Sequence, residues 1–262
     1  MKLEIFFCSI LSFLTVPILG QIKNTNIDLY QAQIWKESED LSLYYRTAQP
    51  EKMEMGQKYP LLLFFHGSGG RGSDNIGQLI DAGGLQAFEK AGIRNRFKSH
   101  FFAGQVPKSE KWVNTGWNLL GHKMPKISQT MRMTFDALDA YVSDPKNQVD
   151  LNRIYVMGLS MGGYGTWDAI QRRPDFFAAA VPICGGGDKS LAKKLIRLPI
   201  WAWHGEKDNV IKPTRSRDMI KAISKAGGSP KYSEIKGRGH NSWVDCWNSD
   251  ALWSWVFSQS KN

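Results

Sequence analysis

Residues 153–162 read RIYVMGLSMG and decide the fold. The first five residues are mostly apolar, which predicts a strand buried on both faces of a sheet. Residues 158–162 then fit the pattern G-x-S-x-G, and a helical pattern follows at 161–172. Small residues around the serine permit a sharp turn from strand to helix, which lifts the hydroxyl out of the sheet edge. We therefore predict that Ser160 is a nucleophile.

Similar apolar runs alternate with helical patterns along the rest of the chain. This alternation predicts an α/β fold with a doubly wound, mostly parallel sheet and helices on both faces. The segment 41–46 is predicted to add antiparallel edge strands. The remaining predicted strands are 61–65, 153–157, 178–183 and 199–204, and the predicted helices are 130–142, 161–172, 214–226 and 247–258.

An acid and a base should follow such a nucleophile in that order, each on a loop after a later strand. Asp208 follows the strand at 199–204, and His240 follows the stretch 232–235. Glu206 shares the turn with Asp208 and is the rival acid, but Asp208 reaches further into the loop. We predict that His240 is the general base and that Asp208 orients it.

The loop at residues 66–72, HGSGGRG, follows the first buried strand. It also fits G-x-G-x-x-G, but a dinucleotide site needs a helix directly after it and an acidic residue after the next strand. Neither is evident, so we predict an oxyanion loop in which the backbone N–H groups of Ser68 and Met161 face the reacting carbonyl. No set of metal ligands with defined spacing is visible, and we expect no metal and no cofactor.

The segment 66–127 has the weakest periodicity, and we predict that it forms substrate-binding loops. Trp112 and Trp117 lie in this segment, and Trp243 follows His240 closely. These indole rings are predicted to stack on an aromatic acyl group or a sugar ring, with packing in the core as the alternative.

The chain resembles the α/β-hydrolase superfamily in four motifs, which begin at His66, Gly158, His204 and Gly239, and in the order and spacing of these motifs. Within it, the chain resembles secreted bacterial esterases related to feruloyl esterases, acetylxylan esterases and polyhydroxybutyrate depolymerases. The resemblance spans about residues 40–260 and implies hydrolysis of a small or polysaccharide-linked carboxylic ester. The basic, Trp-rich segment 108–117 departs from it and leaves the acyl pocket undefined. The motifs are residues 66–69, 158–163, 204–208 and 239–240, supported by 164–167 and 174–179.

Three other classes remain open at this stage. A peptidase of the prolyl-oligopeptidase kind has the same order of residues, but it usually carries an additional domain. A lipase or phospholipase would need a lid helix, and none is evident. A binding protein on a hydrolase scaffold would be expected to lose one of the three catalytic residues, whereas all three are present.

The N-terminal segment 1–20 resembles a secretory signal peptide, with Lys2 before an apolar run and Gly20 at its end. A membrane anchor is the alternative, but the run is short for a bilayer and contains Pro17. We therefore expect export to the periplasm or the medium, with no stable membrane span after cleavage. Residues 21–262 are predicted to form a single catalytic domain.

The formal charge is +10, from 34 basic and 24 acidic residues. The basic residues are scattered and accompany no nucleic-acid motif, so nucleic acid is not an expected partner. After export, Cys184 and Cys246 remain. Two thiols in an oxidising compartment can pair, and the sequence leaves a disulfide and two free thiols open.

Overall fold

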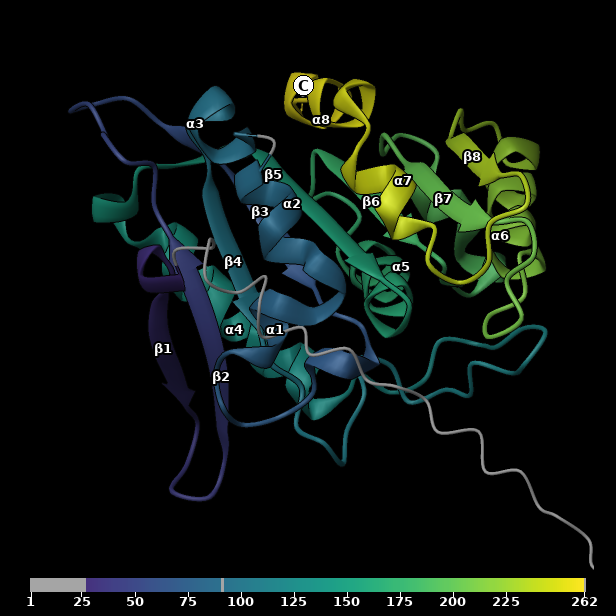
Figure 1. Ribbon diagram of the computed structural model, residues 1–262, viewed down its shortest axis with the longest axis horizontal. Helices are drawn as coiled ribbons and strands as arrows, with labels where there is room; N and C mark the ends of the chain where they lie inside the picture. The colour runs from purple at the N-terminus through teal and green to yellow at the C-terminus, as the bar shows by residue number, and fades with distance from the viewer. Residues whose placement is uncertain (1–26, 91, 262) are drawn as a thin grey trace, which may run out of the picture.

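The structure is a computed structural model that describes residues 27–90 and 92–261. The predicted signal peptide, residues 1–20, lies outside the described residues. Eight strands form one sheet in the order β1-β2-β4-β3-β5-β6-β7-β8, which Figure 1 shows running across the molecule. The strands are β1 (Gln31–Lys36), β2 (Ser42–Ala48), β3 (Tyr59–Phe65), β4 (His100–Gly104), β5 (Val149–Leu159), β6 (Ala179–Ile183), β7 (Trp201–Gly205) and β8 (Lys231–Ile235).

The sheet is antiparallel at one edge and parallel elsewhere. Strand β2 pairs with β1 and β4 in antiparallel register, and the pairs from β4 through β8 are all parallel. The predicted mostly parallel sheet with an antiparallel edge is confirmed. Because the carboxyl ends of parallel strands meet at one edge, the loops after β3, β5, β7 and β8 come together there.

Helices cover both faces of the sheet, as predicted, and each face has its own apolar core. Along β3, Leu61, Leu63 and Phe65 belong to one core, whereas Leu62 and Phe64 belong to the other. This alternation explains why the strand is apolar at every position. One face carries α4 (Gln129–Ser143), α5 (Met161–Arg172) and α6 (Thr214–Lys225), and the other carries α1 (Gly77–Ile80), α2 (Gly84–Lys90), α3 (Ile93–Phe97), α7 (Trp243–Trp247) and α8 (Asp250–Ser258).

Two sequence interpretations need correction. The segment 66–127 is not loop throughout, because it contains α1, α2, α3 and the buried strand β4. These helices have four to seven residues, too few to produce a helical period in the sequence. The predicted helix at 247–258 is split: Ser249 caps α8 by accepting a hydrogen bond from the Leu252 N–H, which ends α7 before it.

A search of the described residues, 27–90 and 92–261, finds no helix with the length and apolar character required to cross a bilayer.

Candidate active site

The turn between β5 and α5 holds Ser160 in an unusual backbone conformation. Ser160 has φ 54° and ψ −116°, although it is not glycine. Such a conformation costs energy and persists only where the surroundings impose it. A Cβ on Gly162 would lie 2.0 Å from the Phe65 carbonyl oxygen, and one on Gly158 would lie 2.5 Å from the Gly162 carbonyl oxygen. The glycines of G-x-S-x-G therefore permit the close packing that raises the Ser160 side chain above the sheet.

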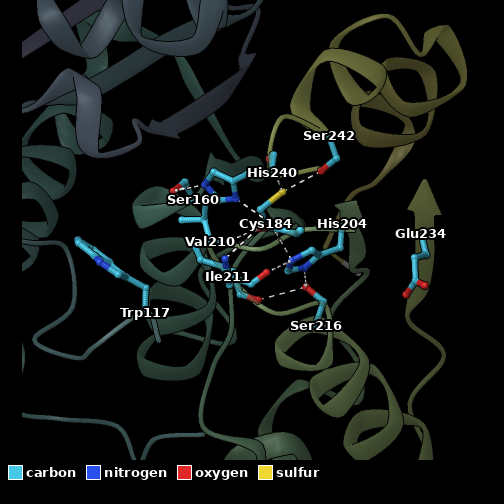
Figure 2. A network of polar contacts seen from close by, with 12 residues as sticks. Trp117, Ser160, Cys184, His204, Val210, Ile211, Ser216, Glu234, His240 and Ser242 are labelled. Atoms are coloured by element: carbon cyan, nitrogen blue, oxygen red, sulfur yellow. Dashed lines mark hydrogen bonds and ion pairs between the residues drawn. The ribbon is translucent and has the colours of Figure 1, made fainter. Parts of the chain in front are cut away.

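Ser160, His240 and Asp208 form one chain of hydrogen bonds. Figure 2 shows the Ser160 and His240 side chains of this chain next to each other. The Ser160 Oγ lies 2.9 Å from His240 Nε2, and His240 Nδ1 lies 2.7 Å from Asp208 Oδ2. With Asp208 ionised, Nδ1 carries the proton and Nε2 is free to accept one from the serine. The structure thus brings together the three residues that the sequence singled out from separate loops.

The Asp208 carboxylate is fully buried and strongly hydrogen-bonded. Its Oδ1 accepts the backbone N–H groups of Val210 and Ile211 at 2.8 and 2.9 Å. Burial alone would raise the pKa of Asp208, but hydrogen bonds from His204 and His240 outweigh it and hold that pKa below its usual range. Asp208 is therefore ionised throughout the neutral range.

A second histidine, His204, approaches Asp208 from β7. Its Nε2 lies 3.2 Å from Asp208 Oδ2 and 2.9 Å from the Ile211 carbonyl oxygen, while its Nδ1 lies 2.8 Å from Ser216 Oγ (Figure 2). The sequence did not indicate a role for His204 at this site. The motif H-G-x-x-D places the two residues four apart across a turn, and this spacing was the missed signal.

Glu206, the rival acid, has a different partner. Its carboxylate accepts the Gly237 N–H at 2.8 Å and lies at the surface. This bond ties the loop after β7 to the loop after β8. A Cβ on Gly205 would lie 2.0 Å from the Gly239 carbonyl oxygen, so the two loops touch there. Glu206 thus holds together the loops that carry Asp208 and His240, and it does not contact the imidazole.

Ser160 opens into a pocket of about 180 Å³. This volume is smaller than that of most drug-sized ligand sites and suits a short acyl group. Arg71, which the sequence did not indicate, is fixed by hydrogen bonds to the carbonyl oxygens of Ser68 and Lys108. The lining residues are Ser68, Arg71, Trp117, Ser160, Val210, Ile211 and His240.

The predicted oxyanion donors lie on the two loops that flank this pocket. Ser68 begins the short 3-10 helix Ser68–Gly70 after β3, and Met161 is the first residue of α5. Among the described residues, neither backbone N–H donates to a protein acceptor. Both amides therefore have a free donor, and the N-terminus of α5 favours negative charge beside Ser160.

His66 fixes the start of this loop. Its Nε2 accepts the Val106 N–H at 3.0 Å, so Nδ1 carries the proton and donates to the Gly67 carbonyl oxygen at 2.6 Å. His66 thus holds the loop through hydrogen bonds to the backbone on both sides of its ring. Burial lowers the pKa of His66 to about 4, and a proton on Nε2 would break the bond to Val106.

Acid is expected to weaken the fold through His66. The unfolded chain binds a proton at His66 below about pH 6.5, whereas the folded protein does so only near pH 4. The free energy of unfolding should therefore fall as the pH drops through this window, by at most about 1.4 kcal/mol per pH unit for this residue. Urea unfolding at pH 6.5 and 4.5 measures it, and His66→Gln should show a smaller decrease than the native protein. An equal decrease in both would contradict the assignment.

The three tryptophans predicted to bind substrate have different environments. Trp112 has no exposed surface, packs on Phe65 at a centroid distance of 4.5 Å, and donates its indole N–H to the His66 carbonyl oxygen. The prediction that Trp112 stacks on substrate is wrong, because the core encloses its ring. Trp117 lines the Ser160 pocket, and Trp243 packs edge-on against the His240 ring at 5.3 Å.

Cys184, His204 and Asp208 place atoms that could bind a metal within 4.8 Å of one another. The Cys184 Sγ lies 3.1 Å from the His240 carbonyl oxygen and 2.8 Å from Ser242 Oγ. Burial raises the pKa of the Cys184 thiol to about 12, whereas a metal ligand must be a thiolate. The arrangement therefore favours a hydrogen-bonded network. Cys184 and Cys246, for which the sequence left a disulfide open, are both buried free thiols.

The fold and the arrangement around Ser160 define an α/β hydrolase. Comparison with family models agrees: residues 97–241 match the model described as the dienelactone hydrolase family. The match covers more than half of the chain and contains all of the Ser160, Asp208 and His240 loops. The chain therefore belongs to the dienelactone hydrolase family.

Two individual proteins are similar to this chain over most of its length. The crystal structure of a thermostable esterase has 32% sequence identity and a TM-score of 0.82, covering 90% of this chain and 64% of that chain. An uncharacterized secreted protein of Arthroderma benhamiae is 25% identical over 231 residues, which are 75% of this chain and 23% of that protein. The chain thus spans less than two thirds of the length of either relative.

More distant structures share the fold alone. A ferulic acid esterase has 16% identity and a TM-score of 0.61, covering 87% of this chain and 96% of that chain. Peptidases with the same fold lie at 13–17% identity. The fold is thus common to esterases and peptidases.

Proposed function

We propose that the protein is a serine hydrolase that cleaves carboxylic esters. The observation that carries the proposal is the chain of hydrogen bonds from Ser160 through His240 to Asp208, which begins at an open pocket. A serine hydroxyl is a weak nucleophile by itself, and an adjacent base oriented by a carboxylate activates it. Membership of the dienelactone hydrolase family and the likeness to a thermostable esterase support ester chemistry.

In the first half-reaction, Ser160 Oγ attacks the ester carbonyl carbon while His240 Nε2 takes the hydroxyl proton. Asp208 holds the imidazole in the required tautomer and stabilises the imidazolium that forms. The tetrahedral intermediate then collapses: the bond to the alcohol oxygen breaks, and His240 gives its proton to that oxygen. The alcohol leaves, and the acyl group stays on Ser160.

The negative charge of the intermediate lies on the former carbonyl oxygen. The N–H groups of Ser68 and Met161 donate to it, and the N-terminus of α5 adds a favourable dipole. One such donor contributes about 2.7–4 kcal/mol to the transition state. Water then attacks the acyl group, His240 takes its proton and returns one to Ser160, and the acid is released. The cycle needs no cofactor.

The substrate class follows from the pocket and from the resemblance to secreted esterases. A volume of about 180 Å³ admits an acetyl group, and the Trp117 ring at its wall offers a stacking surface for an aromatic acyl group such as feruloyl. The substrate we propose is a small or polysaccharide-linked ester, met outside the cell after export. The secreted relative and the N-terminal segment 1–20 support export.

Stoichiometric labelling with a fluorophosphonate tests the nucleophile. We expect one adduct per chain, located on Ser160 by peptide mapping and missing from Ser160→Ala. Chromogenic acetyl, feruloyl and long-chain esters and a prolyl amide then test the reaction. Ester turnover supports the proposal, faster turnover of the amide would favour the prolyl-oligopeptidase alternative, and a preference for long chains would favour a lipase. No adduct on the folded protein would overturn it.

Trp117 provides a test of acyl preference. If its ring stacks on aryl groups, Trp117→Ala should raise KM for a feruloyl ester by about two- to twelvefold and leave KM for an acetyl ester almost unchanged, since a stacked aromatic pair is worth about 0.5–1.5 kcal/mol. Steady-state kinetics on both esters measures the difference. Trp255→Ala, which removes a half-buried indole on α8 outside the pocket lining, is the matched control. Equal effects of Trp117→Ala on both esters would contradict stacking.

A further inference from the structure

A second pocket, of about 320 Å³, lies where α6 begins. This volume falls in the range of sites for small molecules. Residues 120–123 of its lining lie in the segment 66–127, which the sequence predicted to form substrate-binding loops, and the mechanism above uses none of the lining residues. Its lining includes Leu120, His122, Lys123, Asp188, Arg215 and Asp218.

Arg215 is the unusual member of this lining. It is only 4% exposed, yet its Nε has no hydrogen-bond partner within the described part of the chain. Its one side-chain partner there is Nδ1 of His122, a neutral group, because burial and the Arg215 charge lower the pKa of His122 to about 4. No carboxylate among the described residues lies within 4.0 Å of the guanidinium. A buried cation without an anion is costly, so the site is poised for a negatively charged ligand.

The acids of the pocket do not supply that charge. Asp188 pairs with Lys123 at 3.8 Å and accepts the Met124 N–H at 2.9 Å. Asp218 pairs with Lys189 at 3.2 Å. Each carboxylate is therefore matched by a lysine, and the Arg215 charge is left over.

The position of Arg215 in α6 also favours a negatively charged ligand. It is the second residue of the helix Thr214–Lys225, where the helix dipole favours anions over cations. A cation there is destabilising unless an anion lies next to it. The planar guanidinium fork also matches a carboxylate better than a single point charge would.

Contacts connect this pocket to the one at Ser160. Tyr164, one turn after Ser160 on α5, has its ring centroid 5.8 Å from that of His122 and 5.5 Å from the Arg215 guanidinium carbon. Its hydroxyl donates to the Trp117 carbonyl oxygen at 3.4 Å, and Trp117 lines the Ser160 pocket. Tyr164 thus contacts the walls of both pockets.

We propose that Arg215 binds a carboxylate of the ester substrate, so that the preferred substrates are acidic esters, such as those of a hexuronic acid. The assignment of this ligand as a substrate rests on the proposed ester hydrolysis. The anion-binding site itself rests only on the geometry around Arg215. The pocket volume and the apolar Leu120 favour an organic carboxylate over a bare inorganic ion.

Ligand binding to Ser160→Ala tests the site without turnover. We expect D-glucuronate to bind and to raise Tm progressively as its concentration increases, whereas neutral D-glucose does not. Arg215→Met should weaken binding by at least about tenfold, because a charged hydrogen bond is worth about 1.5–3 kcal/mol. Lys225→Met, which removes the same charge from the exposed end of α6, should leave binding unchanged. Constant ionic strength is needed because the whole protein is basic.

Arg215→Lys keeps the charge but loses the fork, and it provides a second variant if Arg215→Met does not fold. We expect it to bind D-glucuronate more weakly than the Ser160→Ala parent. Equal affinity in the parent, Arg215→Met and Arg215→Lys would overturn the proposal. Equal stabilisation by sulfate and D-glucuronate would also overturn it, since it would indicate a site for any small anion.

Hydrolysis of a matched pair of acetyl esters then tests the substrate class. The native protein should hydrolyse acetylated D-glucuronate with at least about tenfold higher kcat/KM than acetylated D-glucose, and Arg215→Met should lose this preference. No preference in the native protein would overturn the substrate assignment. Binding of D-glucuronate without hydrolysis of either ester would support the anion site and contradict only the proposed esterase activity.

Discussion

Ser160→Ala is expected to lower kcat for acetyl and aryl esters by about 10⁴-fold or more. Ala has no hydroxyl to attack the carbonyl, and His240 then has no proton to take. KM should change little, because the pocket walls and the amides of Ser68 and Met161 remain. Stopped assays at high enzyme concentration measure the residual rate, and Ser224→Ala, on the exposed surface of α6, is the control and should keep the native rate.

A small effect of Ser160→Ala would indicate that Ser160 is not the nucleophile. If Ser160→Ala kept more than about a tenth of the native kcat, the hydrogen bond from Ser160 to His240 would be structural and another group would carry the reaction. Circular dichroism of the variant separates a catalytic loss from unfolding, because Ala and Ser differ little in volume and α5 should persist.

The strand, turn and helix around Ser160 can be predicted from the sequence because their requirements are local. Ser160, its flanking glycines and the strand and helix around them lie within 20 residues, and the steric reasons for the glycines are contacts with the neighbouring strand β3. The apolar strands 61–65 and 178–183 agree with β3 and β6 for a similar reason. Burial on both faces leaves a continuous apolar run that the sequence displays directly.

The sequence fails where a role depends on distant partners. Trp112 resembles a loop tryptophan in the sequence, yet Phe65 from β3 and His66 enclose it. Arg215 resembles any basic helix residue, and only folding reveals its burial beside His122 and Tyr164. Strand β4 was missed because it follows helices too short to show a period, so no alternation of strand and helix marks it in the sequence.

The choice between Asp208 and Glu206 as the orienting acid also depends on partners that are distant in the sequence. Both carboxylates follow β7, and their spacing alone favours neither strongly. The contact between Gly205 and the Gly239 carbonyl oxygen fixes the two loops, and in that arrangement Asp208 faces inward to His240 while Glu206 faces outward to Gly237. The decision is thus made by packing between β7 and β8, which are not adjacent in sequence.

Asp208→Asn is expected to lower kcat by about 10⁴-fold, with KM nearly unchanged. The amide is neutral, so it does not stabilise the imidazolium of His240. Its NH₂ group, turned toward His240, would also favour the tautomer in which Nε2 carries the proton and cannot accept one from Ser160. Steady-state kinetics from pH 6 to 9 measures the loss, which should persist across the range because Asp208 is ionised throughout.

Glu206→Gln is the matched control, because it makes the same chemical change two residues away. Gln still accepts the Gly237 N–H through its amide oxygen, so we expect kcat within about threefold of native. A large loss in Glu206→Gln with near-native activity in Asp208→Asn would reverse the assignment and make Glu206 the orienting acid. Equal and small effects of both variants would mean that His240 needs no carboxylate. The buried Asp208, which also contacts His204, would then stabilise the fold and have no part in the reaction.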